Sequence, residues 1–268
     1  AATCPEPDGD VDPSRISSVD LSYIAQGETA LQRALSILQR RAGWQAERMP
    51  DTRIKMSSAA LPGLGKVFRA EVVLAVPVAR LHRELFERME QMPQWNPMLS
   101  QVKVLQRVGT DTLVTHEVTA PSPGNLVGQR DFVSVRHRGR RDTTVYLVGT
   151  TTHTEPLPLQ DRCIRAESRL SCIVLQPLAG DPSSTHFTWL LSIDLKASAT
   201  AFTRGGTHHG AQTHPPPRDG HPPRTVFDQT WGCFLLPKGW IPAAVVNRVV
   251  PQSQADFIEH LRRHLSAP

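Results

Sequence analysis

The sequence predicts an α+β protein in which an antiparallel sheet of about nine strands lies between two terminal helices. Short β-rich segments follow one another from Val102 to Leu195 at intervals of about 8–12 residues, as in a meander. A helical repeat of apolar residues precedes these segments, and a second one follows them near the C-terminus. With 39% hydrophobic residues among 268, the chain has enough apolar side chains for one large core.

The N-terminal part predicts a disordered segment followed by a helix. Residues 1–17 are polar and rich in Pro and Asp, and we expect them to be disordered. Ser18 or Asp20 is the expected cap of a helix that runs to about Arg41. One face of this helix is apolar and consists of Ile24, Leu31, Leu35 and Leu38.

The next segments predict two strands and a second helix. Residues 45–64 contain a weak strand and a Pro/Gly turn, and residues 66–74 contain a clearer strand. Pro77 favours the start of a helix over residues 78–92. Its apolar stripe consists of Leu81, Leu85 and Met89.

The central region predicts seven further strands. They are expected at 102–108, 111–118, 131–138, 143–150, 162–168, 171–177 and 185–195. Alternate residues of a strand share a face, so Phe132 and Arg136 lie on one face and Val133 and Val135 on the other. Glu117 and Arg136 are therefore candidates to meet across the sheet.

The C-terminal part predicts a long amphipathic helix over residues 239–265. Its apolar stripe consists of Val246, Val250, Phe257, Leu261 and Leu265. Pro251 lies within this helix, where a proline costs about 3 kcal/mol or produces a kink. Residues 197–238, just before it, are rich in Gly, Pro and His and are expected to be disordered. We interpret this insertion as a retained intron or a gene-model artefact, which sequencing the transcript across Lys196–Gly239 tests.

Composition argues against several kinds of site. The net charge of +5 is mildly basic, but Lys and Arg are scattered without interleaved aromatic residues, which argues against nucleic-acid binding. None of the four cysteines forms a Cys-x-x-Cys pair, which argues against zinc. Cys163 and Cys172 either face each other across a hairpin or are two buried thiols, and we favour the thiols. The insertion histidines His208, His209, His214 and His221 are interpreted as solvated rather than metal-binding.

The sequence contains no pattern of a known catalytic centre. It has no Gly-x-Gly-x-x-Gly, Walker loop, His-Glu-x-x-His or nucleophile elbow. It also lacks an apolar run of the roughly 18–20 residues that a membrane helix needs. We therefore expect a non-enzymatic protein without a cofactor or a metal. No signal or transit peptide is visible.

Several blocks of sequence resemble the START lipid-transfer family. They are Gln94–Pro97, Lys103–Gln106, Thr115–Glu117, Gly124–Arg136, Ile164–Glu167 and Trp189–Lys196. The resemblance covers roughly residues 19–196 and 239–265 in collinear order. It implies a helix-grip fold for residues 18–268, interrupted at 197–238. In this fold a curved sheet and a C-terminal lid helix enclose a hydrophobic cavity.

The resemblance also implies a function. Members similar to this chain bind cholesterol and transfer it to mitochondria for steroid hormone synthesis. The implied partners are cholesterol and the surface of the mitochondrial outer membrane, and the implied state is a monomer in the mitochondrion and cytosol. Two alternatives remain open: a START carrier of a phospholipid or another sterol, and a lipid-sensing module without transfer activity.

The resemblance assigns candidate residues to the sterol cavity. They are Trp95, Asn96, Glu117, Phe132, Arg136, Leu147, Phe257 and Leu261. Arg130 and Arg165 match basic positions that we interpret as structural. The Glu117–Arg136 pair either holds the sheet together or orders water toward a sterol hydroxyl, and both interpretations stay open.

Two further positions stand out against the family pattern. Ile54 occupies a position where relatives have an acidic residue, which puts the full polar network of the cavity in doubt. Thr143 follows Arg140 and Arg141 and resembles a phosphorylation site of a basophilic kinase, although a solvated hairpin tip explains the same residues.

Overall fold

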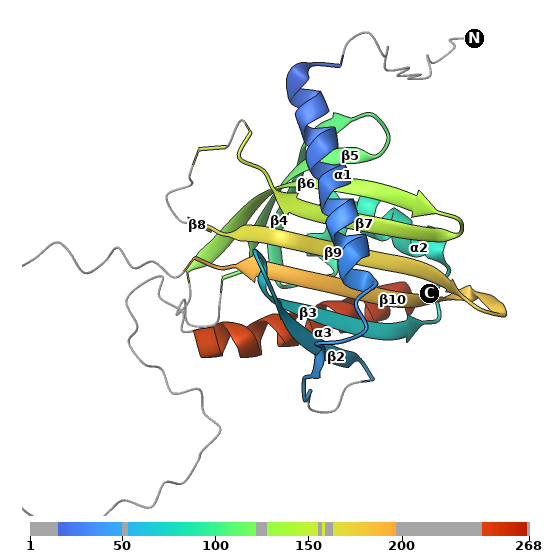
Figure 1. Ribbon diagram of the computed structural model, residues 1–268. Coiled ribbons are helices and arrows are strands. Elements are labelled where there is room, and N and C mark those ends of the chain that lie inside the picture. Colours follow the sequence, from blue (N-terminus) through green and yellow to red (C-terminus); the bar gives the residue numbers. More distant parts are fainter. Residues whose placement is uncertain are drawn as a thin grey trace, which may run out of the picture.

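The sheet separates two layers of helices in the computed structural model (Figure 1). The structure describes residues 16–49, 53–121, 128–154, 157–158, 163–196 and 243–266. Helix α1 (Ser18–Leu38) crosses one face of the sheet, and helix α3 (Ala243–Ser266) lies against the other face (Figure 1). The expected disorder at 1–17 and 197–238 and the expected helix start at 239–242 lie almost entirely outside the described residues.

In the part of the chain that the structure describes, the sheet has ten strands and is antiparallel apart from one short pairing. In chain order the strands are β1 (Gln45–Ala46), β2 (Lys55–Leu61), β3 (Gly65–Leu74), β4 (Leu99–Val108), β5 (Thr112–Thr119), β6 (Gln129–Arg141), β7 (Thr144–Thr151), β8 (Cys163–Arg165), β9 (Glu167–Leu178) and β10 (Asp181–Asp194). Their spatial order is β1-β2-β3-β10-β9-β7-β6-β5-β4, and β8 pairs with β6 in parallel. The START-type fold class expected from the sequence is confirmed.

Two apolar layers lie on opposite sides of this sheet. The α1 face, which packs against α1, includes the buried residues Val67, Val148, Leu170, Cys172 and Leu190. The lid face, which packs against α3 and the segment 78–94, includes Phe68, Leu113, Leu147, Leu175, Phe187 and Leu191. Alternation along each strand assigns neighbouring residues to the two layers.

Helix α1 begins and packs differently from the expectation. Ser17 is the N-cap, and Asp20 at N3 completes a capping box by accepting from the Ser17 amide. The helix ends at Leu38 with Gln39 as its C-cap, before the expected end at Arg41. Its buried face combines the large residues Tyr23, Leu35 and Ile37 with small ones, and the approach is close at Gly27, where a Cβ would lie 2.5 Å from the His137 Cβ. Of the expected stripe, Leu35 is buried, whereas Ile24, Leu31 and Leu38 are only partly buried.

The helix expected over residues 78–92 is divided into three short helical segments. They are α2 (Val78–His82), the π-helical turn η2 (Arg83–Glu87) and the 3₁₀ segment η3 (Met89–Gln94). Pro93 cannot donate a backbone hydrogen bond, which favours the tighter 3₁₀ turn at the end. The expected stripe is nevertheless confirmed, because Leu81, Leu85 and Met89 are all buried.

The segment around Cys163 also differs from the expectation. The single strand predicted over 162–168 is two elements, because β8 pairs with β6 whereas β9 begins at Glu167. Cys163 and Cys172 therefore do not face each other across a hairpin, and both are free thiols. Burial raises the pKa of the Cys172 thiol to about 12, so this thiol is inert.

Helix α3 confirms the predicted apolar stripe. Val250, Phe257, Leu261 and Leu265 are buried against the lid face, and Val246 is partly buried. The helix is continuous through Pro251. None of the described helices is long and apolar enough to span a bilayer.

Candidate functional site

The lid face is apolar but not fully closed. Leu147, Leu175 and Phe187 are buried in its centre, whereas neighbouring apolar residues retain partial exposure. The partly exposed ones include Val104, Ile173, Trp189 and Ile193. Partial exposure under a covering helix is the expected property of side chains that line a ligand cavity.

An ion pair lies at the β5–β6 end of this face. The Arg136 guanidinium donates to the Glu117 carboxylate, and the two side chains are 24% and 15% exposed. The two residues are not directly opposite, because β-sheet register pairs Glu117 with Phe132 and Arg136 with Leu113. Gly149 opposite Arg136 leaves the necessary room, since a Cβ there would lie 2.9 Å from Arg136 Nη1.

Unpartnered polar atoms gather on the same face. Among the described residues, Ser134 Oγ and Arg136 Nε are buried without a hydrogen-bond partner. Thr115 of β5 lies opposite Ser134 of β6, and both lie on the lid face between Glu117 and Arg136. Thr115 Oγ1 donates a hydrogen bond to Glu117 Oε1 at 3.3 Å. A buried donor without a partner costs about 1–3 kcal/mol, so this end of the face favours a ligand hydroxyl or water.

Aromatic residues connect the lid helix to the rest of the site. The Phe257 ring lies 5.5 Å from the Trp95 ring and 5.0 Å from the Trp189 ring. The His264 ring stacks on Trp95 with centroids 5.3 Å apart, and His264 Nε2 lies 3.2 Å from the Glu84 carboxylate. The π-helical turn η2 presents this buried Glu84 toward the lid, a contact that sequence periodicity did not predict.

The other expected site residues occupy several environments. Phe132 is half-buried and lies on the lid face opposite Glu117, and Leu147 is buried on the same face. Leu261 is fully buried under the lid. Asn96 is buried as well, but its Oδ1 accepts from the Met98 amide and so stabilises the local turn.

Two residues singled out by the family pattern have clear positions. Ile54 is 4% exposed and belongs to the apolar cluster of the lid face, so this position supplies no carboxylate to the Glu117–Arg136 pair. Thr143 is exposed in the turn between β6 and β7, two residues after Arg141.

Arg165 belongs to a separate buried network on the α1 face. Its guanidinium donates to both oxygens of Asp131 at 3.0 and 2.9 Å, and His116 Nε2 lies 2.9 Å from Asp131 Oδ2. Burial alone would raise the pKa of Asp131, but the bonds from Arg165 and His116 outweigh it and lower that pKa. Arg130 is also buried and donates to the carbonyls of Gly128 and Leu195. These contacts support a structural role for both arginines.

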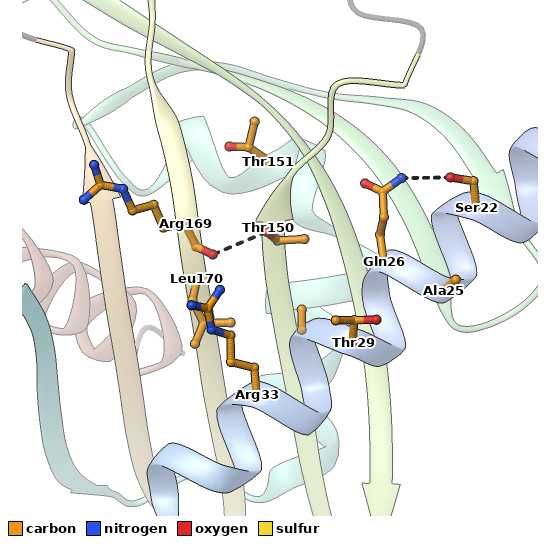
Figure 2. Close-up of a pocket in the computed structure, with 10 residues that line it drawn as sticks. Ser22, Ala25, Gln26, Thr29, Arg33, Thr150, Thr151, Arg169 and Leu170 are labelled. Atoms are coloured by element: carbon orange, nitrogen blue, oxygen red, sulfur yellow. Dashed lines mark hydrogen bonds between the residues drawn. The ribbon is translucent and has the colours of Figure 1, made fainter. Parts of the chain in front are cut away.

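A groove of about 360 Å³ lies on the α1 face, between α1 and strands β7 and β9 (Figure 2). Arg33 and Gln26 of α1 and Thr150 and Arg169 of the strands line it (Figure 2). Seven of its ten lining residues have polar side chains, so a large, wholly apolar ligand would cover many groups that need hydrogen-bond partners. Within the described part of the chain, no group of three or more His, Cys, Asp or Glu residues is placed to bind a metal.

Comparisons with known proteins agree with this geometry. The family model named START domain matches residues 24–210. The chain is 44% identical to the steroidogenic acute regulatory protein, mitochondrial, of Gallus gallus over 93% of this chain and 74% of that protein. It is 43% identical to the Homo sapiens protein of the same name, over 94% of this chain and 73% of that protein.

A solved structure shares the fold at low sequence identity. Human StAR-related lipid transfer protein 5 superposes with a TM-score of 0.67 at 16% identity, covering 91% of this chain and 96% of that one. The sheet, the terminal helices and the apolar lid face define a lipid-binding protein of the helix-grip type. The chain belongs to the START domain family.

Proposed function

We propose that this protein binds one cholesterol molecule between the lid face and α3 and carries it to mitochondria for steroid hormone synthesis. The observation that carries the proposal is the partly exposed Glu117–Arg136 pair at one end of an otherwise apolar face. A sterol is a rigid apolar body with one hydroxyl, and it needs a tunnel with a polar group at one end. The high similarity to mitochondrial steroidogenic acute regulatory proteins supports the same cargo and destination.

In this proposal the cavity residues divide into two roles. Glu117 and Arg136, with water or directly, bind the sterol hydroxyl, because a carboxylate accepts and a guanidinium donates. Apolar and aromatic residues bind the ring system and tail: Trp95, Phe132, Leu147, Phe257 and Leu261. Asn96 contributes by fixing the turn that positions Trp95. No bond is made or broken, so the protein acts as a monomeric carrier rather than as an enzyme.

A phospholipid is a poorer match for these residues. A phosphate head group needs an unpaired cationic site, but the charge of Arg136 is already balanced by Glu117. A carrier and a lipid sensor both bind cholesterol at equilibrium, and only transfer between membranes distinguishes them.

Titration with a fluorescent cholesterol analogue tests the proposal. We expect saturable one-to-one binding, and about tenfold weaker binding for Arg136→Met, because one hydrogen bond to a ligand contributes roughly 1.4 kcal/mol. Thermal unfolding of the variant serves as the control for folding. Transfer from donor vesicles to isolated mitochondria is then measured. Saturable binding without any transfer would support the sensor alternative, and preferred binding of fluorescent phosphatidylcholine would overturn the sterol assignment.

A further inference from the structure

The groove on the α1 face takes no part in the proposed sterol binding, because it lies on the opposite side of the sheet from the lid face (Figure 2). Its volume of about 360 Å³ is within the range of roughly 300–1,000 Å³ that is typical of small-molecule sites. Along α1 the lining extends from Ser22 to Arg33, which is about 16 Å at a rise of about 1.5 Å per residue. The groove therefore has room for a small polar ligand.

The charged groups that line this groove are both cations. They are Arg33 of α1 and Arg169 of β9, and none of the ten lining residues is acidic. A Cβ on Gly63 would lie 3.0 Å from Arg33 Nη2, and a Cβ on Gly65 would lie 3.1 Å from Arg169 Nη1. Both glycines adjoin the turn between β2 and β3, so the two guanidinium groups lie against the same turn. This end of the groove is therefore suited to an anion.

The two arginines differ in the partners that they already have. Arg169 donates to the Asp194 carboxylate at 2.7 Å and to the Leu64 carbonyl at 3.4 Å. Asp194 also lies 3.6 Å from Lys196 Nζ, so cations already surround this carboxylate. Within the part of the chain that the structure describes, the exposed Arg33 guanidinium has no ion pair or hydrogen bond. Arg33 thus keeps its donors for a ligand, and a guanidinium binds phosphate through two parallel hydrogen bonds.

The walls beyond the arginines offer hydroxyl groups and an amide. Thr29 of α1 and Thr150 of β7 lie on the two sides of the groove (Figure 2). Gln26 Nε2 donates to Ser22 Oγ at 3.1 Å and to Thr154 Oγ1 at 3.2 Å, which uses both of its hydrogens. Figure 2 shows the Gln26 Oε1 directed to the other side, toward β7. This oxygen can accept a hydrogen bond from a ligand hydroxyl.

The remaining lining residues narrow the class of ligand. Ala30 and Leu170 are buried and give the groove an apolar base between its polar walls. A sugar or another polyol fits this arrangement, because its C–H groups can contact the base while its hydroxyls meet the walls. A nucleotide fits less well, because none of the ten lining residues has an aromatic ring on which a base could stack.

We infer that the groove between α1 and strands β7 and β9 binds a phosphorylated polyol. Arg33, with Arg169 as a second cation, binds the phosphate, and Gln26, Thr29 and Thr150 bind hydroxyls of the polyol. The same chemical group occurs in a soluble sugar phosphate and in the head group of a phosphorylated inositol lipid. The groove and the sterol cavity lie on opposite sides of the sheet, so neither ligand depends on the presence of the other.

Calorimetric titration of the full chain with glucose 6-phosphate tests the site. We expect saturable one-to-one binding that is at least tenfold tighter than binding of inorganic phosphate, and no binding of glucose. Arg33→Gln should weaken binding about tenfold, and Arg169→Gln about threefold, because Arg169 remains engaged with Asp194. Arg107→Gln removes the same charge from an exposed position of β4, at the opposite edge of the sheet, and should change nothing. Equal losses in the Arg33 and Arg107 variants would overturn the inference.

A variant that fills the groove separates a built site from surface charge alone. Ala25 is an exposed lining residue of α1, about two helical turns before Arg33. Ala25→Phe should occupy the polyol end, so glucose 6-phosphate should bind about tenfold more weakly while inorganic phosphate binds as before. Thermal unfolding is the control for folding. If the affinity for glucose 6-phosphate does not change, the polyol does not lie in the groove and the inference fails.

Vesicle flotation distinguishes the two sources of the phosphorylated polyol. The probes are phosphatidylcholine vesicles that contain either phosphatidylinositol 4-phosphate or phosphatidylserine. Flotation with the inositol lipid alone, lost in Arg33→Gln, would assign the groove to a lipid head group, whereas binding of glucose 6-phosphate without flotation would assign it to a soluble ligand. Equal flotation with both lipids, or binding of neither the vesicles nor the soluble probe, would overturn the inference. If the protein binds no cholesterol, the proposed function fails and these outcomes still decide the groove.

Discussion

On strand β9, adjacent residues meet two different environments. Cys172 points toward α1 and is completely buried, whereas Ile173 points toward α3 and stays partly exposed. The same contrast holds along the sheet, because α1 approaches so closely that Gly27 has no room for a side chain against His137. The contact between α1 and the sheet is therefore close at Gly27, whereas Ile173 and its apolar neighbours on the lid face keep partial exposure.

Polar groups follow the same division. On the α1 face the carboxylate of Asp131 is satisfied by both Arg165 and His116. Of the five buried side-chain polar atoms that lack a partner among the described residues, four lie on or beside the lid face. They belong to Trp95, Ser134, Arg136 and Gln254. In our proposal the α1 face maintains the fold, whereas the lid face binds the sterol.

The largest expected effect comes from breaking the network on the α1 face. Asp131→Ala leaves the Arg165 guanidinium largely buried without its counter-charge, and we expect a loss of about 3–5 kcal/mol in the free energy of unfolding. Urea denaturation measures it. Asp111→Ala is the control, because that carboxylate is 48% exposed and its pair with Arg138 contributes less than about 1 kcal/mol. Equal losses in the two variants would contradict the division between the faces.

Matched enlargements on β9 give a smaller but more specific effect. Cys172→Leu overpacks the α1 face and should cost about 1–3 kcal/mol, because a close-packed core has no space for extra methyl groups. Ile173→Phe, one residue away, should change stability by less than about 1 kcal/mol and abolish binding of the cholesterol analogue by filling the cavity.

Denaturation and sterol titration of both β9 variants measure the contrast. If Ile173→Phe proves as destabilising as Cys172→Leu, the lid face is packed as tightly as the α1 face. If Ile173→Phe instead keeps full sterol binding, the ligand does not occupy this part of the lid face.

The strands and the lid helix were predictable because their side-chain patterns are local. Alternation around Val133 and Val135 assigned Glu117 and Arg136 to one face correctly, and the stripe through Phe257 was confirmed. The sequence predicted neither the division of residues 78–94 into three segments nor the contact of Glu84, in the π-helical turn, with His264 of the lid. Local periodicity contains no information about such a tertiary contact.

The details of the polar networks also required the structure. Asp131 and His116 meet only because β5 pairs with β6 in one register, and a shift of one residue would separate them. Gly27 of α1 gave no apolar signal, although it lies so close to the sheet that a Cβ there would be 2.5 Å from the His137 Cβ. Gln254 lies inside the apolar stripe of α3, where a polarity pattern predicts only an interruption.

The smallest expected effect is a dependence of stability on mild acid, which originates on the α1 face. Burial lowers the pKa of His137, whose Nδ1 lies 2.9 Å from Thr112 Oγ1 beneath α1. The unfolded chain, with its ordinary histidine pKa near 6.5, binds a proton more readily than the folded protein does. Stability is therefore complete above that pKa and decreases as the pH falls below about 6.5.

Urea denaturation between pH 7.5 and about pH 5 measures this dependence. His137→Asn should give a flatter profile over this range, even if its stability at pH 7.5 is lower. His153→Asn, a change at an exposed histidine, should leave the slope unchanged. An unchanged slope in His137→Asn would place the acid sensitivity elsewhere, with His82 near the end of the lid face as the next residue to test, because burial lowers its pKa as well.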